Sequence, residues 1–215
     1  MIKAVVFDLD DTLYNEYDYV KSGFCAVADY LGDPKVFDKL IELYHIDNNN
    51  VFQRMGLTDD TCQKCIEIYR NHFPEISLRE DVMKVLHKLK ENNFKLGIIT
   101  DGRVEGQRNK LQALGLYKLI PNVIITDTLG IEFRKPHPKS FERMRECLDV
   151  QFDEMMYVGD NPQKDFYIGK IYPIYTVRID SPKNGLYGGT KYYGDVVENL
   201  RINRMEELLD VLNIG

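Results

Sequence analysis

The amino-acid sequence predicts an α/β fold, in which a doubly wound parallel sheet carries a small helical cap domain. Two observations favour this fold class. Short apolar runs alternate with amphipathic segments along most of the 215 residues, and such runs are typical of parallel strands that are buried on both faces. Residues 15–77, by contrast, contain only helical patterns, which predicts a helical insertion after the first strand.

The first half of the sheet domain is read from four segments. Residues 2–8 form an apolar run rich in valine, which predicts a buried strand. Residues 79–92 predict a helix, because their apolar side chains recur at helical spacing. The apolar residues 94–100 predict a second strand, and residues 103–114 predict a helix that ends before Gly115, a residue type favoured after a helix.

The second half repeats the alternation. Residues 122–126 predict a third strand, and residues 138–148 predict a helix that begins at a proline, which suits the first turn. Residues 155–160 and 173–179 are apolar and predict the fourth and fifth strands. The apolar spacing in residues 204–212 predicts a closing helix.

The insertion defines the expected domain boundaries. We expect a core domain of residues 1–14 and 78–215, and a helical cap domain of residues 15–77. One cap helix is predicted from an apolar face at helical spacing, formed by Val20, Phe24, Val27 and Leu31. Connections in α/β folds are usually short, so an insertion of this length predicts a functional element such as a lid.

Composition limits the possible partners. The net charge is −6, with 44% hydrophobic and 29% charged residues, which is typical of a soluble globular protein. An acidic chain argues against binding to nucleic acid or to a membrane surface, and no signal segment is evident, so we expect a cytoplasmic protein. Cys62 and Cys65 are spaced like half of a zinc site but lack a second pair, which favours a packing role. The glycine-rich residues 185–195 do not match a phosphate-binding loop and predict a flexible surface segment. The sequence does not indicate an oligomeric state.

Polar residues follow the predicted strands, and the carboxyl ends of parallel strands form one edge of a sheet where ligands bind. Carboxylates that converge there repel one another unless a cation lies between them. Oxygen ligands of this kind suit Mg²⁺, which commonly shares a substrate phosphate, and a lysine and a threonine hydroxyl then fit the remaining phosphate oxygens. The residues at these ends are Asp8, Asp10, Thr12, Thr100, Asp101, Gly102, Lys135, Asp160 and Asp165.

These residues resemble the four motifs of the haloacid dehalogenase-like hydrolases, in order and with a helical cap inserted after the first motif. The matching stretches are D-L-D-D-T from Asp8, the strand end at Thr100, the loop at Lys135-Pro136, and G-D-N-P-Q-K-D from Gly159. The resemblance spans the chain from the first strand to the last helix. It implies a Rossmann-like core and catalysis of phosphoryl transfer.

The resemblance also implies residue roles. Asp8 would attack phosphorus and form an aspartyl-phosphate. Asp10 would protonate the leaving alcohol and then accept a proton from water. Magnesium would be held by the Asp8 carboxylate, the Asp10 backbone carbonyl and Asp160.

Other residues would complete the phosphate site. Thr100, the backbone amides of Asp101 and Gly102, and Lys135 would bind phosphoryl oxygens, with Asp165 and Thr12 as supporting residues that do not touch the substrate. The family often has asparagine where this chain has Asp101, and we expect only the backbone amide to act there. In the cap region, Arg54 and Tyr14 are candidates for substrate recognition, although Arg54 also fits a solvated surface residue.

The sequence therefore predicts a magnesium-dependent phosphatase for a small phosphorylated metabolite, a sugar phosphate or a nucleotide. A phosphoglucomutase-like phosphotransferase shares all of these motifs and stays open. A catalytically silent binding module of the same fold also stays open, although no catalytic group is missing. A dehalogenase is disfavoured, because that reaction needs neither a metal nor an acid at Asp10.

Overall fold

The structure, a computed structural model, describes residues 1–180 and 191–214. Of the predicted glycine-rich segment, residues 185–190 lie outside the described residues. The described residues form a sheet of six parallel strands in the order β3-β2-β1-β4-β5-β6. The strands are β1 (Ala4–Phe7), β2 (Lys95–Thr100), β3 (Asn122–Ile125), β4 (Met155–Gly159), β5 (Tyr175–Ile179) and β6 (Leu200–Ile202). The doubly wound parallel sheet is thus confirmed.

The sixth strand was not predicted. Strand β6 (Leu200–Ile202) pairs only with β5, at the edge of the sheet. Its three residues include an exposed arginine, so the segment lacks the continuous apolar run that marks the buried central strands. A short edge strand of this kind is recognised only when its neighbour is in place.

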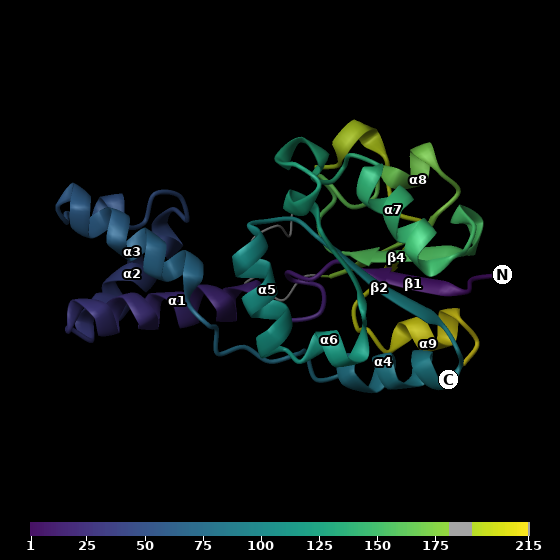
Figure 1. The fold of residues 1–215 in the computed structure, drawn as a ribbon, viewed down its shortest axis with the longest axis horizontal. Helices are drawn as coiled ribbons and strands as arrows, with labels where there is room; N and C mark the ends of the chain where they lie inside the picture. The colour runs from purple at the N-terminus through teal and green to yellow at the C-terminus, as the bar shows by residue number, and fades with distance from the viewer. Residues whose placement is uncertain (181–190, 215) are drawn as a thin grey trace.

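Helices cover both faces of the sheet because successive strand residues point to opposite sides. Helices α4 (Val82–Glu91), α5 (Val104–Ala113), α6 (Leu116–Leu119) and α9 (Glu207–Val211) pack on one face, and α7 (Lys139–Leu148) and α8 (Ile168–Ile171) pack on the other. In β1, for example, Val5 and Phe7 join the first cluster and Val6 joins the second. This arrangement is the three-layered core visible in Figure 1.

The segment between β1 and α4 forms a separate helical lobe (Figure 1), built from α1 (Glu16–Leu31), α2 (Lys35–Ile46) and α3 (Asp59–Asn71). Helix α1 begins at Asn15, whose side chain accepts a hydrogen bond from the Tyr17 amide, and ends at Gly32, which has a positive φ of 68°. The lobe has its own apolar cluster, which includes the predicted face of α1 and the buried Cys62 and Cys65. The two cysteines are therefore packing residues, as predicted.

No helix within the two described ranges is both long enough and apolar enough to cross a lipid bilayer.

Candidate active site

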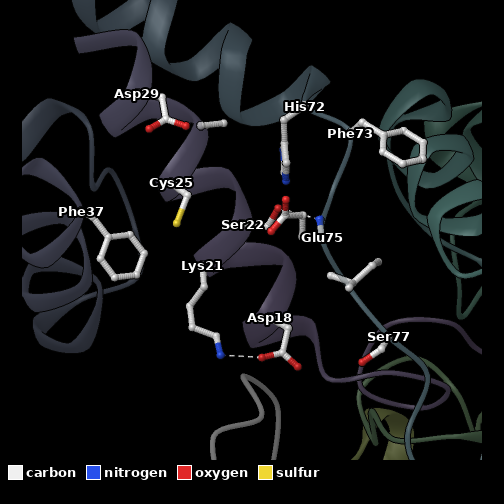
Figure 2. Close-up of a pocket in the computed structure, with 12 residues that line it drawn as sticks. Asp18, Lys21, Ser22, Cys25, Asp29, Phe37, His72, Phe73, Glu75 and Ser77 are labelled. Carbon is white, nitrogen blue, oxygen red and sulfur yellow. Dashed lines mark hydrogen bonds and ion pairs between the residues drawn. The ribbon is translucent and has the colours of Figure 1, made fainter. Parts of the chain in front are cut away.

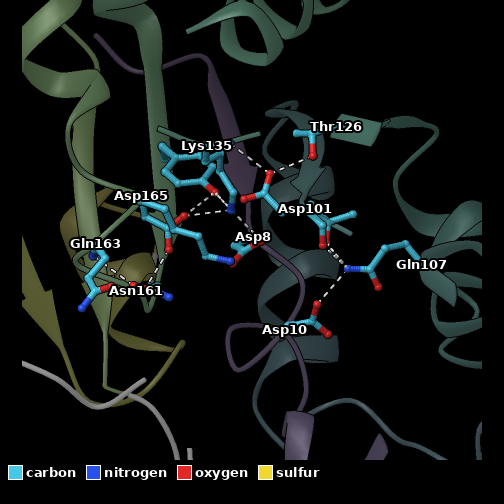
Figure 3. Close-up of polar contacts among 12 residues, drawn as sticks. Asp8, Asp10, Asp101, Gln107, Thr126, Lys135, Asn161, Gln163 and Asp165 are labelled. Carbon is cyan, nitrogen blue, oxygen red and sulfur yellow. Dashed lines mark hydrogen bonds and ion pairs between the residues drawn. The ribbon is translucent and has the colours of Figure 1, made fainter. Parts of the chain in front are cut away.

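Asp8 lies at the point where the strand order of the sheet reverses. Strand β1 pairs with β2 on one side and with β4 on the other, and the Asp8 amide donates to the Val158 carbonyl at 2.8 Å. Parallel sheets bind ligands beyond their carboxyl ends at such a switch point. Asp8 therefore occupies the position in this fold that is best placed to meet a ligand (Figure 3).

Two lysines flank the Asp8 carboxylate, which is only 1% exposed. The Lys135 ammonium lies 2.8 Å from Asp8 Oδ1, and the Lys164 ammonium lies 3.7 Å from Asp8 Oδ2. Apart from these two ammonium groups, neither oxygen of Asp8 has a hydrogen-bond partner among the described residues. Burial raises the pKa of Asp8, and the two lysines oppose that shift. The Asp8 carboxylate is therefore buried and held between two positive charges.

Lys135 is held rigidly in the loop before α7. Its fully buried ammonium donates hydrogen bonds of 2.8 Å to Tyr157 Oη and of 2.8 Å to Asp165 Oδ1, both of which come from the β4 side of the site. Burial opposes the charge of Lys135, but Asp165 and Asp8 outweigh it and raise the lysine pKa. Lys135 is thus a permanent cation beside Asp8.

Three buried carboxylates gather behind these lysines. Asp8, Asp160 and Asp165 each place one oxygen within 4.8 Å of the others. Burial raises the pKa of Asp160 well above its usual value, and Asp165 and Asp8 add to that shift. The close approach of Asp165 requires Gly159, because a Cβ there would lie 2.6 Å from Asp165 Oδ2. Such a cluster is the donor set that a hard divalent cation prefers.

Within this cluster, Asp165 is already engaged. Its Oδ1 accepts from Lys135 and Tyr157, and its Oδ2 accepts from the Asn161 amide at 2.8 Å. Asp165 therefore orients Lys135 through contacts that occupy both of its carboxylate oxygens.

Asp10 points away from Asp8 and toward helix α5 (Figure 3). Its carboxylate forms an ion pair of 2.7 Å with Lys110 and accepts a hydrogen bond of 2.8 Å from Gln107, and the Tyr14 hydroxyl donates to it as well. Burial disfavours the carboxylate, but Lys110 and the hydrogen bonds outweigh burial and lower the pKa of Asp10. The three donors stabilise the ionised form of Asp10.

The end of β2 supplies a second group of polar residues. Thr100 is fully buried, and its hydroxyl accepts from Gln107 Nε2 at 2.8 Å. The Asp101 side chain turns toward β3, where it accepts from the Thr126 hydroxyl at 2.8 Å and from the Lys135 amide at 3.1 Å. Gly102 follows with φ at 137°, a value that glycine adopts readily. Asp101 therefore ties the loop of Lys135 to the end of β2 through its side chain, and its own amide stays near the strand end.

Asp11 and Thr12 complete the turn after β1. Asp11 has a positive φ of 54°, which aspartate tolerates better than most residues, and its carboxylate accepts from the Glu16 amide at 2.9 Å. This contact fixes the first turn of α1. Thr12 is fully buried, and its hydroxyl makes no hydrogen bond to a described residue.

The two residues expected to recognise substrate lie in different places. Tyr14 is fully buried and contacts Asp10, so the structure brings it to the site as a partner of that carboxylate. Arg54 instead closes the end of α2: its guanidinium donates to the backbone carbonyls of Leu43, Asp47 and Asn49. The structure thus does not bring Arg54 to the strand ends.

A groove of about 780 Å³ also lies in the helical lobe, between α1 and the segment 72–77 (Figure 2). Its lining includes Asp18, Lys21, Cys25 and His72, and none of the predicted catalytic residues is among the residues that line it. The groove is therefore distinct from the cluster of charged residues at the strand ends.

Sequence reasoning missed four residues that the structure places at the site: Lys110, Gln107, Lys164 and Tyr157. Gln107 and Lys110 are three residues apart on α5, beside the apolar face that includes Leu111 and Leu114, and polar residues at such positions signal a buried polar partner. Lys164 lies inside the motif stretch that begins at Gly159 but was given no role there, and Tyr157 carries no comparable signal. A lysine in a polar loop and a tyrosine in a strand are both ordinary.

Comparisons with known proteins agree with this geometry. The family model for haloacid dehalogenase-like hydrolases matches residues 5–179. A glyceraldehyde 3-phosphate phosphatase from Methanopyrus kandleri is 30% identical, over 99% of this chain and 97% of that protein. The pyrophosphatase PpaX from Anoxybacillus flavithermus is 26% identical, over 99% of this chain and 98% of that protein.

Solved structures share the fold. The HAD hydrolase YfnB from Bacillus subtilis, crystallised with magnesium, has a TM-score of 0.73 at 17% identity and covers 99% of each chain. A HAD phosphatase from Thermococcus onnurineus has a TM-score of 0.63 at 24% identity, over 100% of this chain and 99% of that chain. With the family model covering most of the sequence and the motif residues meeting at one sheet edge, the chain belongs to the haloacid dehalogenase-like hydrolases.

Proposed function

We propose that this hydrolase is a magnesium-dependent phosphatase that cleaves a small phosphorylated metabolite through an aspartyl-phosphate on Asp8. The observation that carries the proposal is the state of Asp8. Its carboxylate is buried between Lys135 and Lys164, and no donor other than these two cations contacts it among the described residues. A nucleophile needs free lone pairs, and the two cations suit the negative charge of an incoming phosphoryl group.

The acidic cluster fits magnesium. Asp8 and Asp160, with the Asp10 backbone carbonyl, would hold the ion, since Asp165 is engaged by Lys135 and Tyr157. Bound there, magnesium would offset the charge of the converging carboxylates and of the phosphate.

The protein residues supply the remaining steps. Asp8 attacks phosphorus, the ester P–O bond breaks, and the leaving alcohol takes a proton from Asp10. Water then attacks the phosphorus, gives its proton to Asp10, and releases phosphate from Asp8. The donors around Asp10 favour its ionised form, which suits the second step. For the first step, the anionic phosphate beside Asp10 raises the pKa of Asp10 by like-charge repulsion.

Thr100, the amides of Asp101 and Gly102, and Lys135 are proposed to bind the phosphoryl oxygens, with Asp165 and Thr12 as supporting residues. Residues 15–77 are proposed to act as a cap domain over a core of residues 1–14 and 78–215. A sugar phosphate or a nucleotide is the proposed substrate class. Relatives named glyceraldehyde 3-phosphate phosphatase and pyrophosphatase support a small phosphorylated substrate.

The decisive experiment replaces Asp8 with asparagine and measures Mg²⁺-dependent release of an aryl alcohol from its phosphate ester. We expect turnover to fall at least a thousandfold, with an unchanged circular dichroism spectrum, because the amide cannot attack phosphorus. Asp18→Asn, at a partly exposed position in α1, is the matched control. Undiminished turnover of the Asp8 variant would contradict the nucleophile assignment.

A phosphoglucomutase-like phosphotransferase would use the same residues. The two activities separate when phosphate release is compared with isomerisation of the same sugar phosphate.

A further inference from the structure

Lys164 is a second cation on the nucleophile, and it differs from Lys135 in how it is held. Lys135 is fully buried and donates to Tyr157 and Asp165. The Lys164 side chain is 23% exposed, and its ammonium makes no hydrogen bond to any residue that the structure describes. Its nearest ionic partner is Asp8, at 3.7 Å. Lys135 is thus fixed in place, whereas Lys164 is held mainly by charge.

The position of Lys164 conflicts with a bound divalent cation. Its ammonium lies beside the Asp8 carboxylate, which also belongs to the acidic cluster with Asp160. Two cations within a few ångströms of one carboxylate repel each other, and burial strengthens that repulsion because little water screens it. A metal ion that binds Asp8 therefore weakens the ion pair of Lys164.

Lys164 has room to respond, whereas Lys135 does not. A lysine side chain is long and flexible, and that of Lys164 is 23% exposed. A phosphate ester that binds beside Asp8 would bring negative charge to the same place. The ammonium that the metal displaces thus gains a new anionic partner at short range.

We propose that Lys164 balances the charge of Asp8 in the metal-free protein, is displaced when Mg²⁺ binds, and then binds the phosphate of the substrate. The inference rests on the proposed function. One consequence is coupling: magnesium and phosphate each increase the affinity of the protein for the other, by the same factor. Lys164 contributes to this coupling because its ammonium opposes the metal ion at Asp8 and attracts the phosphate.

The first experiment titrates the whole protein with Mg²⁺ alone, by calorimetry, with no phosphate present. Lys164→Met keeps the length of the side chain and removes its charge. We expect this variant to bind Mg²⁺ about tenfold more tightly than the unmodified protein, because the competing cation is gone. Lys170→Met, at an exposed position in α8, should leave the Mg²⁺ affinity unchanged.

The second experiment titrates the Mg²⁺-loaded proteins with inorganic phosphate. We expect Lys164→Met to bind phosphate about tenfold more weakly, and Lys164→Arg to restore most of the affinity, because it keeps the charge. If Lys164→Met does not fold, Lys164→Gln is used in both titrations.

If Lys164→Met or Lys164→Gln binds Mg²⁺ no more tightly than the unmodified protein, the metal does not displace Lys164. If the same variant binds phosphate with unchanged affinity, Lys164 does not bind the phosphate. Both readouts are independent of turnover. If Asp8→Asn abolishes activity but the titrations fail, only the role of Lys164 is wrong. If Asp8→Asn stays active, the proposed function itself is wrong.

Discussion

Lys110 places its ammonium against Asp10 in a part of the site where both side chains are nearly inaccessible, at 7% and 14% exposure. It also lies 4.2 Å from the centre of the Tyr19 ring, in the first helix of the lobe. Lys110→Met would leave the Asp10 carboxylate buried without its counter-ion. We expect the free energy of unfolding, measured with urea, to fall by about 3 kcal/mol.

Lys90→Met, at an exposed position on α4, is the control and should change stability little. In the double variant with Asp10→Asn the two losses should not add, because both substitutions remove the same ion pair. Additive losses would show that Lys110 stabilises the fold through other contacts.

Glu16, at the start of α1, makes stability depend on pH. Burial and the nearby Asp10 raise the pKa of Glu16 to about 8, whereas in an unfolded chain a glutamate titrates near pH ~4.3. The folded state therefore binds the proton of the Glu16 carboxyl group more tightly than the unfolded state does. The contribution of Glu16 is therefore complete below about pH 4 and is lost as pH rises through about 8.

We expect Glu16→Gln to show a smaller decline in unfolding free energy between acidic and mildly alkaline pH than the unmodified protein. Urea titrations at pH values on both sides of this range measure that difference. Glu67→Gln, at an exposed position in α3, should leave the decline unchanged. An identical decline in the Glu16 variant would contradict the assignment.

At the residue scale, the candidate site residues were chosen by their spacing along the chain, and their catalytic roles stay predictions. Asp8, Asp160 and Lys135 were expected at one sheet edge and meet there. The partners of Asp10 were not expected. Lys110 reaches it across a separation of 100 residues, and such a contact depends on how α5 packs rather than on local pattern.

The contact between α1 and α3 depends on Gly23. A Cβ at this position would lie 2.5 Å from Cδ2 of Tyr69, so the absence of a side chain lets the tyrosine ring pack against the helix. Gly23→Ala should lower the free energy of unfolding by about 1–3 kcal/mol through overpacking, although alanine otherwise favours a helix. The measurement is a urea unfolding curve.

Gly106→Ala in α5 is the matched control. Its added Cβ would meet nothing nearer than the Arg70 carbonyl oxygen at 3.6 Å, which is an ordinary contact. We expect this variant to be as stable as the unmodified protein or more stable by up to about 1 kcal/mol. A stabilised Gly23 variant would show that the Tyr69 ring moves aside at little cost.

The elements themselves follow closely from apolar spacing. The strands of the sheet centre are buried on both faces and read as unbroken apolar runs, so β1, β2 and β4 were found near their observed ends. The edge strand β6 was missed because an edge strand is defined by its neighbour. Residues 15–77 were expected to be helical from their apolar spacing, and helices α1, α2 and α3 occupy this segment and share an apolar cluster.

For the molecule as a whole, magnesium should couple to stability. The ion would bind a cluster that exists only in the folded chain, where Asp8, Asp160 and Asp165 converge. At a Mg²⁺ concentration a hundred times the dissociation constant, the unfolding free energy should rise by about 2.7 kcal/mol. Thermal unfolding with Mg²⁺ and with a chelator measures the rise.

Asp160→Asn is the diagnostic variant, since it removes one carboxylate from the cluster and keeps the side-chain volume. It should lose most of the rise in unfolding free energy that Mg²⁺ causes, because the cluster then lacks one of its carboxylates. Asp153→Asn, in the segment before β4, should keep the full rise. A full rise in the Asp160 variant would place the ion elsewhere.

The backbone contacts of Tyr14 bear on how the helical lobe is attached to the sheet. It forms isolated bridges with Asp10 and with Leu78, so the chain leaves the sheet for the helical lobe and returns to it at the same spot. The segments that lead into and out of the helical lobe therefore lie next to each other. An insertion attached in this way can be replaced by one of another length or shape without any change in the order or pairing of the strands. Evolution could therefore change the helical lobe while the carboxylates at the strand ends keep their positions.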